Sequence, residues 1–158
     1  MDLHLFEEAL KALQFPKSSE GLSLNIKAFF ISKKIPNHII EFYERFSFIH
    51  SIRFGSNFFY KANDLDEENK DMPNSKCIES GLLIIGHGLN GDYIVLNLKS
   101  SHIGFIYHDE LYENEECRIE NIYIDMGLSL GEFYNKSFNE KGFPVDGYQA
   151  EIYKNNLV

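Results

Sequence analysis

One glycine motif in the sequence has the residues needed to hold a nucleotide. Residues 86–91, Gly-His-Gly-Leu-Asn-Gly, match G-x-G-x-x-G after an apolar stretch, and acids at 109 and 110 follow about 20 residues later. In a dinucleotide site a helix begins at the third glycine, because its N–H groups and dipole meet the pyrophosphate. Here the apolar and β-branched residues 93–98 predict a strand instead. Asn90-Gly91 is typical of a type I′ turn with two positive φ angles, so we predict a hairpin and no cofactor.

Other residues that could do chemistry do not form a catalytic or metal-binding pattern. The candidates are His87, His102, His108, Asp92 and Asp109, and no pair among them has the i, i+4 spacing of ligands on a helix. Cys77 and Cys117 are far apart and lack a second thiol or imidazole at ligand spacing, so we expect reduced thiols. The G-x-S-x-G elbow of serine hydrolases is absent. We therefore predict no catalytic residues, no metal site and no enzymatic activity.

The net charge of −9 is concentrated in two short segments. Residues 64–71 contain five acids and one base, and residues 109–120 contain six acids and one base. The rest of the chain holds 13 acids and 13 bases and is neutral. Because nucleic-acid binding needs a basic surface that displaces phosphate counterions, this distribution excludes DNA or RNA as a direct ligand.

Length predicts a single domain, and hydropathy predicts that the chain does not span a membrane. A chain of 158 residues is typical of a single domain, 1–158. Apolar runs reach about four residues, whereas a membrane-spanning helix needs about 18–20. The first residues, Met-Asp-Leu-His-Leu-Phe-Glu-Glu, lack the positive start and apolar stretch of a secretory signal. We expect a cytoplasmic protein that does not contact membranes.

Hydrophobic periodicity predicts an α+β fold with an antiparallel meander. Helices are expected at 2–14, at 36–46 with Pro36 in the first turn, and from the capping box of Ser129 and Glu132 to about Gly142. Strands are expected at 24–30, 51–60, 81–85, 93–98, 103–107 and 119–124, with an edge strand possible at 148–153. Residues 62–75 are acidic and without period, and we expect a mobile loop there.

The order of these elements carries a resemblance to a known family. The matching segments are Ile35-Pro36-x-x-Ile39-Ile40-x-Phe42-Tyr43, Leu83-x-Ile85-Gly86-x-Gly88-x-x-Gly91-Asp92-x-Ile94-x-Leu96, Ile103-Gly104-x-Ile106-Tyr107-His108-Asp109 and Ser129-Leu130-x-Glu132-Phe133-Tyr134. In this order they resemble the SUKH superfamily, which joins bacterial immunity proteins that neutralise polymorphic toxins to fungal regulators of cell-wall glucan synthesis. The resemblance covers about residues 30–138.

The resemblance implies a curved, mainly antiparallel sheet of about five to six strands with flanking helices. The recurrent family positions fall on Pro36, Gly86, Gly91 and Asp92, and Gly88 belongs to the same structural motif. We expect structural roles for them: Pro36 starts a helix, Gly86 and Gly91 permit turn dihedrals, and Asp92 accepts backbone hydrogen bonds in the turn. The chain departs from the family pattern at 46–49, where relatives carry a polar turn and this chain has Phe-Ser-Phe-Ile.

The resemblance also implies binding to a protein. The first hypothesis is an immunity protein that blocks a basic toxin domain of the nuclease or deaminase type, with the acidic segments facing the toxin. The candidate contact residues are Asp64, Asp66, Glu67, Glu68, Asp109, Glu110, Glu113, Glu115 and Glu116. The alternative is an intracellular regulator or scaffold, and solvated acidic loops without a partner remain a further interpretation. If the acids are not involved, the aromatics at 46–48, expected to be exposed, and the tail 143–153 are the next surfaces to consider.

Overall fold

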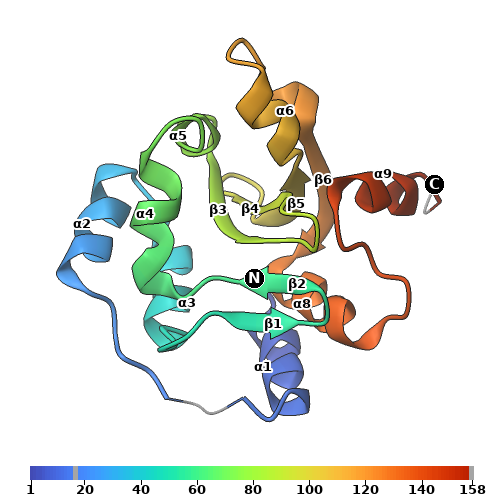
Figure 1. Ribbon diagram of the computed structural model, residues 1–158. Helices are drawn as coiled ribbons and strands as arrows, with labels where there is room; N and C mark the ends of the chain where they lie inside the picture. Colours follow the sequence, from blue (N-terminus) through green and yellow to red (C-terminus); the bar gives the residue numbers. More distant parts are fainter. Residues whose placement is uncertain (16–17, 157–158) are drawn as a thin grey trace.

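The computed structural model describes residues 1–15 and 18–156 and contains a six-stranded antiparallel sheet (Figure 1). The strands are β1 (Ile52–Phe54), β2 (Asn57–Phe59), β3 (Leu82–His87), β4 (Tyr93–Asn97), β5 (His102–Ile106) and β6 (Tyr123–Ser129). Each strand pairs with its neighbour in sequence, and β1 and β6 lie at the two edges of the open, curved sheet. The predicted α+β class and antiparallel meander are confirmed.

Helices surround this sheet on both faces. They are α1 (Leu3–Ala12), α2 (Leu24–Ser32), α3 (Asn37–Arg45), the short 3₁₀ helix η1 (Ala62–Asp64), α4 (Leu65–Lys70), α5 (Ser75–Glu79), α6 (His108–Glu113), α7 (Ile119–Ile122), α8 (Leu130–Asn139) and α9 (Gly147–Asn156). Figure 1 shows α1 and α8 on one side of the sheet and α5 and α6 on the other. The sheet is therefore covered from two directions.

Alternation along the strands divides the core into two clusters. Phe59, Ile94 and Phe105 point to the larger cluster, which includes residues of α1, α2, α3 and α8. Ile84 and Val95 point to the opposite face, where they pack with residues of α5, α6 and α7. Because successive side chains of a strand alternate between faces, neither face of the central strands is free of apolar contacts.

Three predicted helices are confirmed, and their ends follow the expected chemistry. Helices α1 and α3 occupy the ranges predicted at 2–14 and 36–46, with Pro36 immediately before α3. The Ser129 hydroxyl accepts a hydrogen bond from the Glu132 backbone N–H at 3.3 Å, and the Glu132 carboxylate accepts one from the Ser129 N–H at 2.8 Å. This reciprocal pair is the predicted capping box at the start of α8.

The predicted strand at 24–30 is wrong, because this segment is helix α2. Ile26, Phe29 and Phe30 are spaced by three and one and share the buried face of the helix, whereas Leu24 and Ile31 lie on the exposed face. A helix that is apolar on two opposite faces loses the usual amphipathic period, and its sequence imitates strand alternation.

The expectations for 51–75 are also corrected. The predicted single strand at 51–60 is a hairpin, because Gly55 adopts φ +61° between β1 and β2. The predicted mobile loop at 62–75 contains η1 and α4, and α5 begins at its end. Asn69 holds α4 in place: its side chain donates to the Leu65 and Ile84 carbonyls and accepts from the Ile84 N–H, each at 2.9 Å. A helix that is held by hydrogen bonds of a buried amide needs no regular spacing of apolar residues, so the sequence carries no periodic signal for it.

Two later strands were misplaced as well. The range 119–124 contains α7 followed by the start of β6, and β6 extends to Ser129. The segment proposed as an edge strand at 148–153 is part of helix α9. Its apolar side chains Tyr148, Ala150 and Ile152 alternate with polar ones, which is a strand-like pattern on a helix.

The connection between β3 and β4 is a turn, but not of the predicted type. Gly91 has φ +98°, as expected, but Asn90 does not have a positive φ, so the turn is not type I′. The Gly91 N–H donates to the Gly88 carbonyl at 3.3 Å, and the Gly88 N–H donates to the Asp92 carbonyl at 2.8 Å. Gly86 lies within β3, where a Cβ would come 1.9 Å from the Phe58 carbonyl oxygen. Its role is close approach of strand β2, and the expectation of a turn dihedral there is wrong.

Candidate functional site

A single row of side chains crosses the sheet on the face opposite the larger core. The strand register aligns one residue from each strand as direct cross-strand neighbours: Arg53, Phe58, His87, Tyr93, Ile106 and Tyr123. Directly paired residues of antiparallel strands point to the same face and their side chains interact. We call the first four residues, on β1 to β4, the sheet row.

The sheet row is open to solvent while its continuation is covered. Ile106 is fully buried in the smaller core cluster under α6 and α7, whereas Phe58, His87 and Tyr93 are half-buried and Arg53 is exposed. The rings of Phe58 and His87 stack with centroids 4.5 Å apart, and the Arg53 guanidinium lies 5.5 Å from the Phe58 ring centroid. The row therefore presents stacked planar groups to an incoming molecule.

The protonation of His87 follows from its single hydrogen bond. Its Nδ1 lies 2.8 Å from the carbonyl oxygen of Gly88, and a carbonyl only accepts, so Nδ1 carries a proton. Nε2 has no partner within residues 1–15 and 18–156. In the neutral ring this Nε2 accepts a hydrogen bond, and in the protonated ring it donates one. His87 thus offers a polar contact in the middle of an aromatic row.

A closed triangle of hydrogen bonds fixes the end of the row at Tyr93. The Asn74 amide donates to the Tyr93 hydroxyl at 3.1 Å, and the Tyr112 hydroxyl donates to Asn74 Oδ1 at 3.2 Å. Since that bond uses the only hydroxyl proton of Tyr112, the 3.0 Å contact between the two tyrosines has Tyr93 as its donor. Burial raises the pKa of Tyr93 well above its ordinary value, so the ring stays neutral.

The same asparagine connects the two acidic segments predicted from the sequence. Asn74 also donates to the Glu68 backbone carbonyl at 3.0 Å, and Lys76 donates to the Glu115 carbonyl at 2.6 Å. The segment 64–68, on η1 and α4, and the segment 109–116, on and after α6, are therefore linked through residues 74–76. Figure 1 shows α4, α5 and α6 following one another around one side of the sheet.

The acidic candidates differ in how far their charge is compensated. Asp64 pairs with Lys61 at 3.2 Å, Glu67 with Lys70 at 4.0 Å, and Asp109 with His108 Nε2 at 2.9 Å. The candidates without an ion pair among the described residues are Asp66, Glu68, Glu110, Glu113, Glu115 and Glu116. Burial, and secondarily the nearby Asp64, raises the pKa of Glu68, while His87 opposes this shift. Most of the uncompensated charge therefore lies in the second segment.

Asp92 acts inside the fold, where it ties three segments together. Oδ1 accepts from the His108 backbone N–H and from His108 Nδ1, both at 3.0 Å. Oδ2 accepts from the Gly147 N–H at 2.8 Å and from Asn90 at 3.0 Å. Burial alone would raise the pKa of this carboxyl, but the four hydrogen bonds outweigh it and lower the pKa. Both backbone N–H groups that donate to this carboxylate lie outside the turn, at α6 and α9, and the turn itself contributes only the Asn90 side chain, so the expectation of backbone bonds within the turn is corrected.

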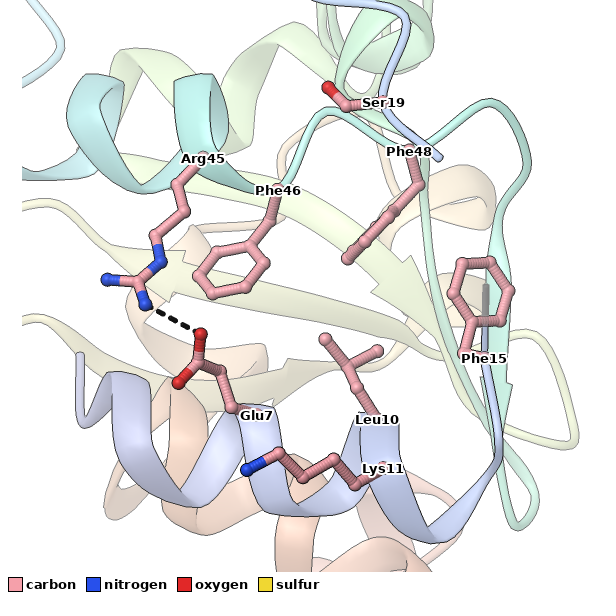
Figure 2. A pocket seen from close by; sticks show the side chains of 8 residues that line it. All are labelled: Glu7, Leu10, Lys11, Phe15, Ser19, Arg45, Phe46 and Phe48. Atoms are coloured by element: carbon pink, nitrogen blue, oxygen red, sulfur yellow. Dashed lines mark hydrogen bonds and ion pairs between the residues drawn. The ribbon is translucent and has the colours of Figure 1, made fainter. Parts of the chain in front are cut away.

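A cavity lies apart from the sheet row, between α1 and the end of α3. Figure 2 shows Leu10, Phe15, Phe46 and Phe48 directed into a cavity of about 320 Å³. At one end of it the Arg45 guanidinium pairs with the Glu7 carboxylate at 2.6 Å. Phe46 and Phe48 are each only 5% exposed, so the expectation that the aromatics at 46–48 are exposed is wrong. They form a cavity wall, and none of the predicted acidic residues lies there.

The C-terminal tail does not form a continuous aromatic surface. Phe143 is 4% exposed, and its ring contacts that of Tyr153 with centroids 5.4 Å apart. The Tyr153 hydroxyl donates to Glu140 at 3.1 Å, while Tyr148 is exposed. Phe143 and Tyr153 therefore pack with the larger core cluster, and of the three aromatic residues only Tyr148 faces solvent.

Sequence reasoning missed the sheet row because its members lie on four different strands. Arg53, Phe58 and Tyr112 carried no motif, and His87 was considered only as a metal ligand or a turn residue. The available signal was polar or aromatic side chains at alternate positions of the strands, but combining them requires the pairing register.

Further observations concern ligands, membranes and relatives. In the described part of the chain, histidine, cysteine and acidic side chains do not gather in groups of three suited to a metal ion. No helix of residues 1–15 and 18–156 has the length and hydropathy needed to span a bilayer.

Comparisons with protein-family models, curated proteins and solved structures found no match to this chain.

Proposed function

We propose that the chain is a non-enzymatic protein-binding domain that acts as an immunity protein and grips a basic toxin domain with the sheet row and its acidic border. The observation that carries this proposal is the placement of two acidic segments beside an open row of Arg, Phe, His and Tyr side chains. Arginine and tyrosine are enriched at the energetic centres of protein interfaces. The resemblance to the SUKH superfamily supports the same class of function.

The chemistry of the surface favours a cationic partner. Aromatic faces attract Lys and Arg side chains, and the uncompensated carboxylates of 109–116 attract the basic groups with which a nuclease holds phosphate. The stacked rings are fixed before binding, so less side-chain entropy is lost when a partner docks. An acidic inhibitor of this kind occupies the surface that the toxin needs for its anionic substrate.

The alternative function is an intracellular regulator or scaffold with a neutral or acidic peptide partner. The cavity in Figure 2 favours it, because an apolar cleft with a polar rim suits an aromatic or aliphatic peptide side chain. The two functions predict different contact residues, since the cavity and the sheet row share none.

Capture from the native cell with two variants separates them. Wild type, Arg53→Glu/Tyr112→Ala and Arg45→Glu are used as baits, and captured proteins are identified by mass spectrometry. The immunity function predicts a basic protein that Arg45→Glu retains and Arg53→Glu/Tyr112→Ala loses, and whose toxicity to cells is suppressed by wild type. A partner lost only with Arg45→Glu supports the regulator, and a captured partner that is not toxic contradicts the immunity function.

A further inference from the structure

Helix α2 has an exposed apolar face that the fold itself leaves uncovered. Leu24 is 84% exposed and Ile31 is 75% exposed, and these are the two most exposed large apolar side chains of the described residues. Together with the exposed Ala28 they follow the spacing i, i+4, i+7, which places them along one face of the helix. The two most exposed large apolar side chains of the described residues therefore belong to one stripe.

The opposite face of α2 is already fixed in the core. Ile26, Phe29 and Phe30 are each at most 8% exposed and belong to the larger core cluster. A helix that is apolar on both faces is normally covered on both. Because the core side cannot turn outward, no other part of the described chain covers the stripe of Leu24, Ala28 and Ile31.

Charge along α2 indicates what covers the stripe. Lys27, Lys33 and Lys34 lie in the middle and at the C-terminal end, and they form no ion pair within residues 1–15 and 18–156. One acid, Glu20, lies at the other end: the Ser23 N–H, which precedes the helix, donates to Asn63 at 2.8 Å, and Asn63 donates to Glu20 at 2.7 Å. An acidic side chain therefore lies near the N-terminus of α2, and basic side chains lie at its C-terminus.

We propose that a second copy of this chain covers the stripe, forming a two-fold dimer in which two α2 helices pack antiparallel with Ala28 at the axis. In this arrangement Leu24 of one copy meets the partner's Ile31, and the small Ala28 side chain permits close approach of the helices. The lysines of each copy face the acidic end of the other, and the helix dipoles run antiparallel. In such a dimer each copy buries the apolar stripe of the other, and the lysines of each copy lie near the acidic end of its partner.

The expected dimer is weak. A stable interface buries about 800 Å² on each partner, and a nine-residue helix contributes only part of this area. The association should therefore depend on protein concentration. Figure 1 shows α2 beside α4 and at a distance from α6 and α9, so this surface is separate from most of the sheet row border.

Sedimentation velocity of the full chain tests the dimer. The expected result is a shift from monomer toward dimer between about 1 μM and 1 mM, a range typical of weak interfaces. Leu24→Glu/Ile31→Glu should keep the protein monomeric throughout, with an unchanged circular dichroism spectrum. The matched control is Leu89→Glu, which places the same charge on another exposed apolar side chain and should dimerise as wild type does.

A cross-linking variant tests the axis without altering the stripe strongly. Ala28→Cys in a Cys117→Ser background should form a disulfide-linked dimer when oxidised glutathione is added, and Asn25→Cys in the same background should not. A monomer at every concentration, a dimer that survives Leu24→Glu/Ile31→Glu, or equal cross-linking at 25 and 28 would overturn the proposal.

Discussion

The rings of Phe58 and His87 stack across the β2–β3 pair, with centroids 4.5 Å apart and planes 22° from parallel. This contact exists because the register places the two residues directly opposite each other on the same face of the sheet. It also joins Arg53, over Phe58, to Tyr60, whose ring centroid lies 5.6 Å from that of His87. The sheet row is thus a preformed surface, and its rigidity is the physical basis of the proposed function.

Replacing Asp92 with Asn should destabilise the fold and remove part of its acid sensitivity. An amide has one accepting oxygen, so one of the buried donors, from His108 or Gly147, would face an NH₂ group, at a cost of about 1–3 kcal/mol. The lowered pKa of Asp92 means that its ionised form contributes stability above the ordinary value of 3.8, and this contribution is lost as the pH falls through the folded-state pKa.

Urea unfolding measured at pH 7 and near pH 3 checks this prediction. The difference in unfolding free energy between wild type and Asp92→Asn should be large at pH 7 and should shrink in acid. Asp66→Asn, which removes a carboxylate without an ion pair in the described structure, is the control and should match wild type. A pH-independent difference would contradict the assigned role of the ionised carboxylate.

Gly86→Ala should destabilise the protein more than Gly81→Ala. A Cβ at Gly86 would lie 1.9 Å from the Phe58 carbonyl oxygen, so β2 and β3 would have to separate, at a cost of about 3 kcal/mol or more. Gly81 has φ +79° with no atom within 4 Å of its Cβ position, so alanine there should cost only about 1 kcal/mol of backbone strain. Thermal melting of both variants distinguishes them, and equal melting temperatures would argue against the close approach of β2 at Gly86.

The two cysteines should react at very different rates. Burial raises the pKa of the Cys77 thiol to about 12, so it is neither accessible nor ionised at pH 8, whereas Cys117 is half-buried. Titration with Ellman's reagent should therefore give one thiol quickly and the second only after unfolding in guanidinium. Cys117→Ser should abolish the fast phase, and a fast phase that persists in this variant would show that Cys77 is not buried.

The sequence predicted those elements whose stability comes from simple amphipathic packing or local capping. Residues 36–46 and the Ser129–Glu132 box are of this type, as are the central strands with alternating apolar side chains. Predictions were wrong where tertiary contacts decide the structure. Helix α2 is apolar on two faces, and α4 is held by the buried amide of Asn69.

The candidate site was predictable only in its acidic part. A charge count along the chain locates 64–68 and 109–116, because sequence neighbours share a segment whatever the fold. The link between them depends on Asn74 and Tyr112, which are far apart in sequence and carry no motif. The sheet row depends on register, and a shift by one residue would move each side chain to the other face.

Neutralising the acidic segments should slow association with the proposed toxin partner and leave the fold intact. One variant changes Asp64, Asp66, Glu67 and Glu68 to Asn or Gln, and a second changes Asp109, Glu110, Glu113, Glu115 and Glu116 in the same way. The second set should have the larger effect, because its side chains are exposed and only Asp109 has an ion pair among the described residues. Steering acts over a Debye length of about 8 Å at physiological salt.

Stopped-flow association rates at several salt concentrations provide the check. The slower association of the variants should approach that of wild type as the salt concentration rises, with dissociation rates nearly unchanged. If both variants associate at the wild-type rate in low salt, the acidic segments serve solubility only and the partner is not steered by them.

The central claim is that the open sheet row holds the toxin, and the most direct measurement is the affinity of the captured toxin for wild type and for Phe58→Ala/Tyr112→Ala. Loss of one aromatic contact in the row, Phe58, and one at its border, Tyr112, should raise the dissociation constant at least about 30-fold, mainly through faster dissociation, since each such contact contributes on the order of 1 kcal/mol or more. The control is Phe138→Ala, which removes an exposed aromatic ring on α8 and should bind as wild type does. A dissociation constant unchanged by Phe58→Ala/Tyr112→Ala, in a variant that melts as wild type does, would contradict the proposed binding surface.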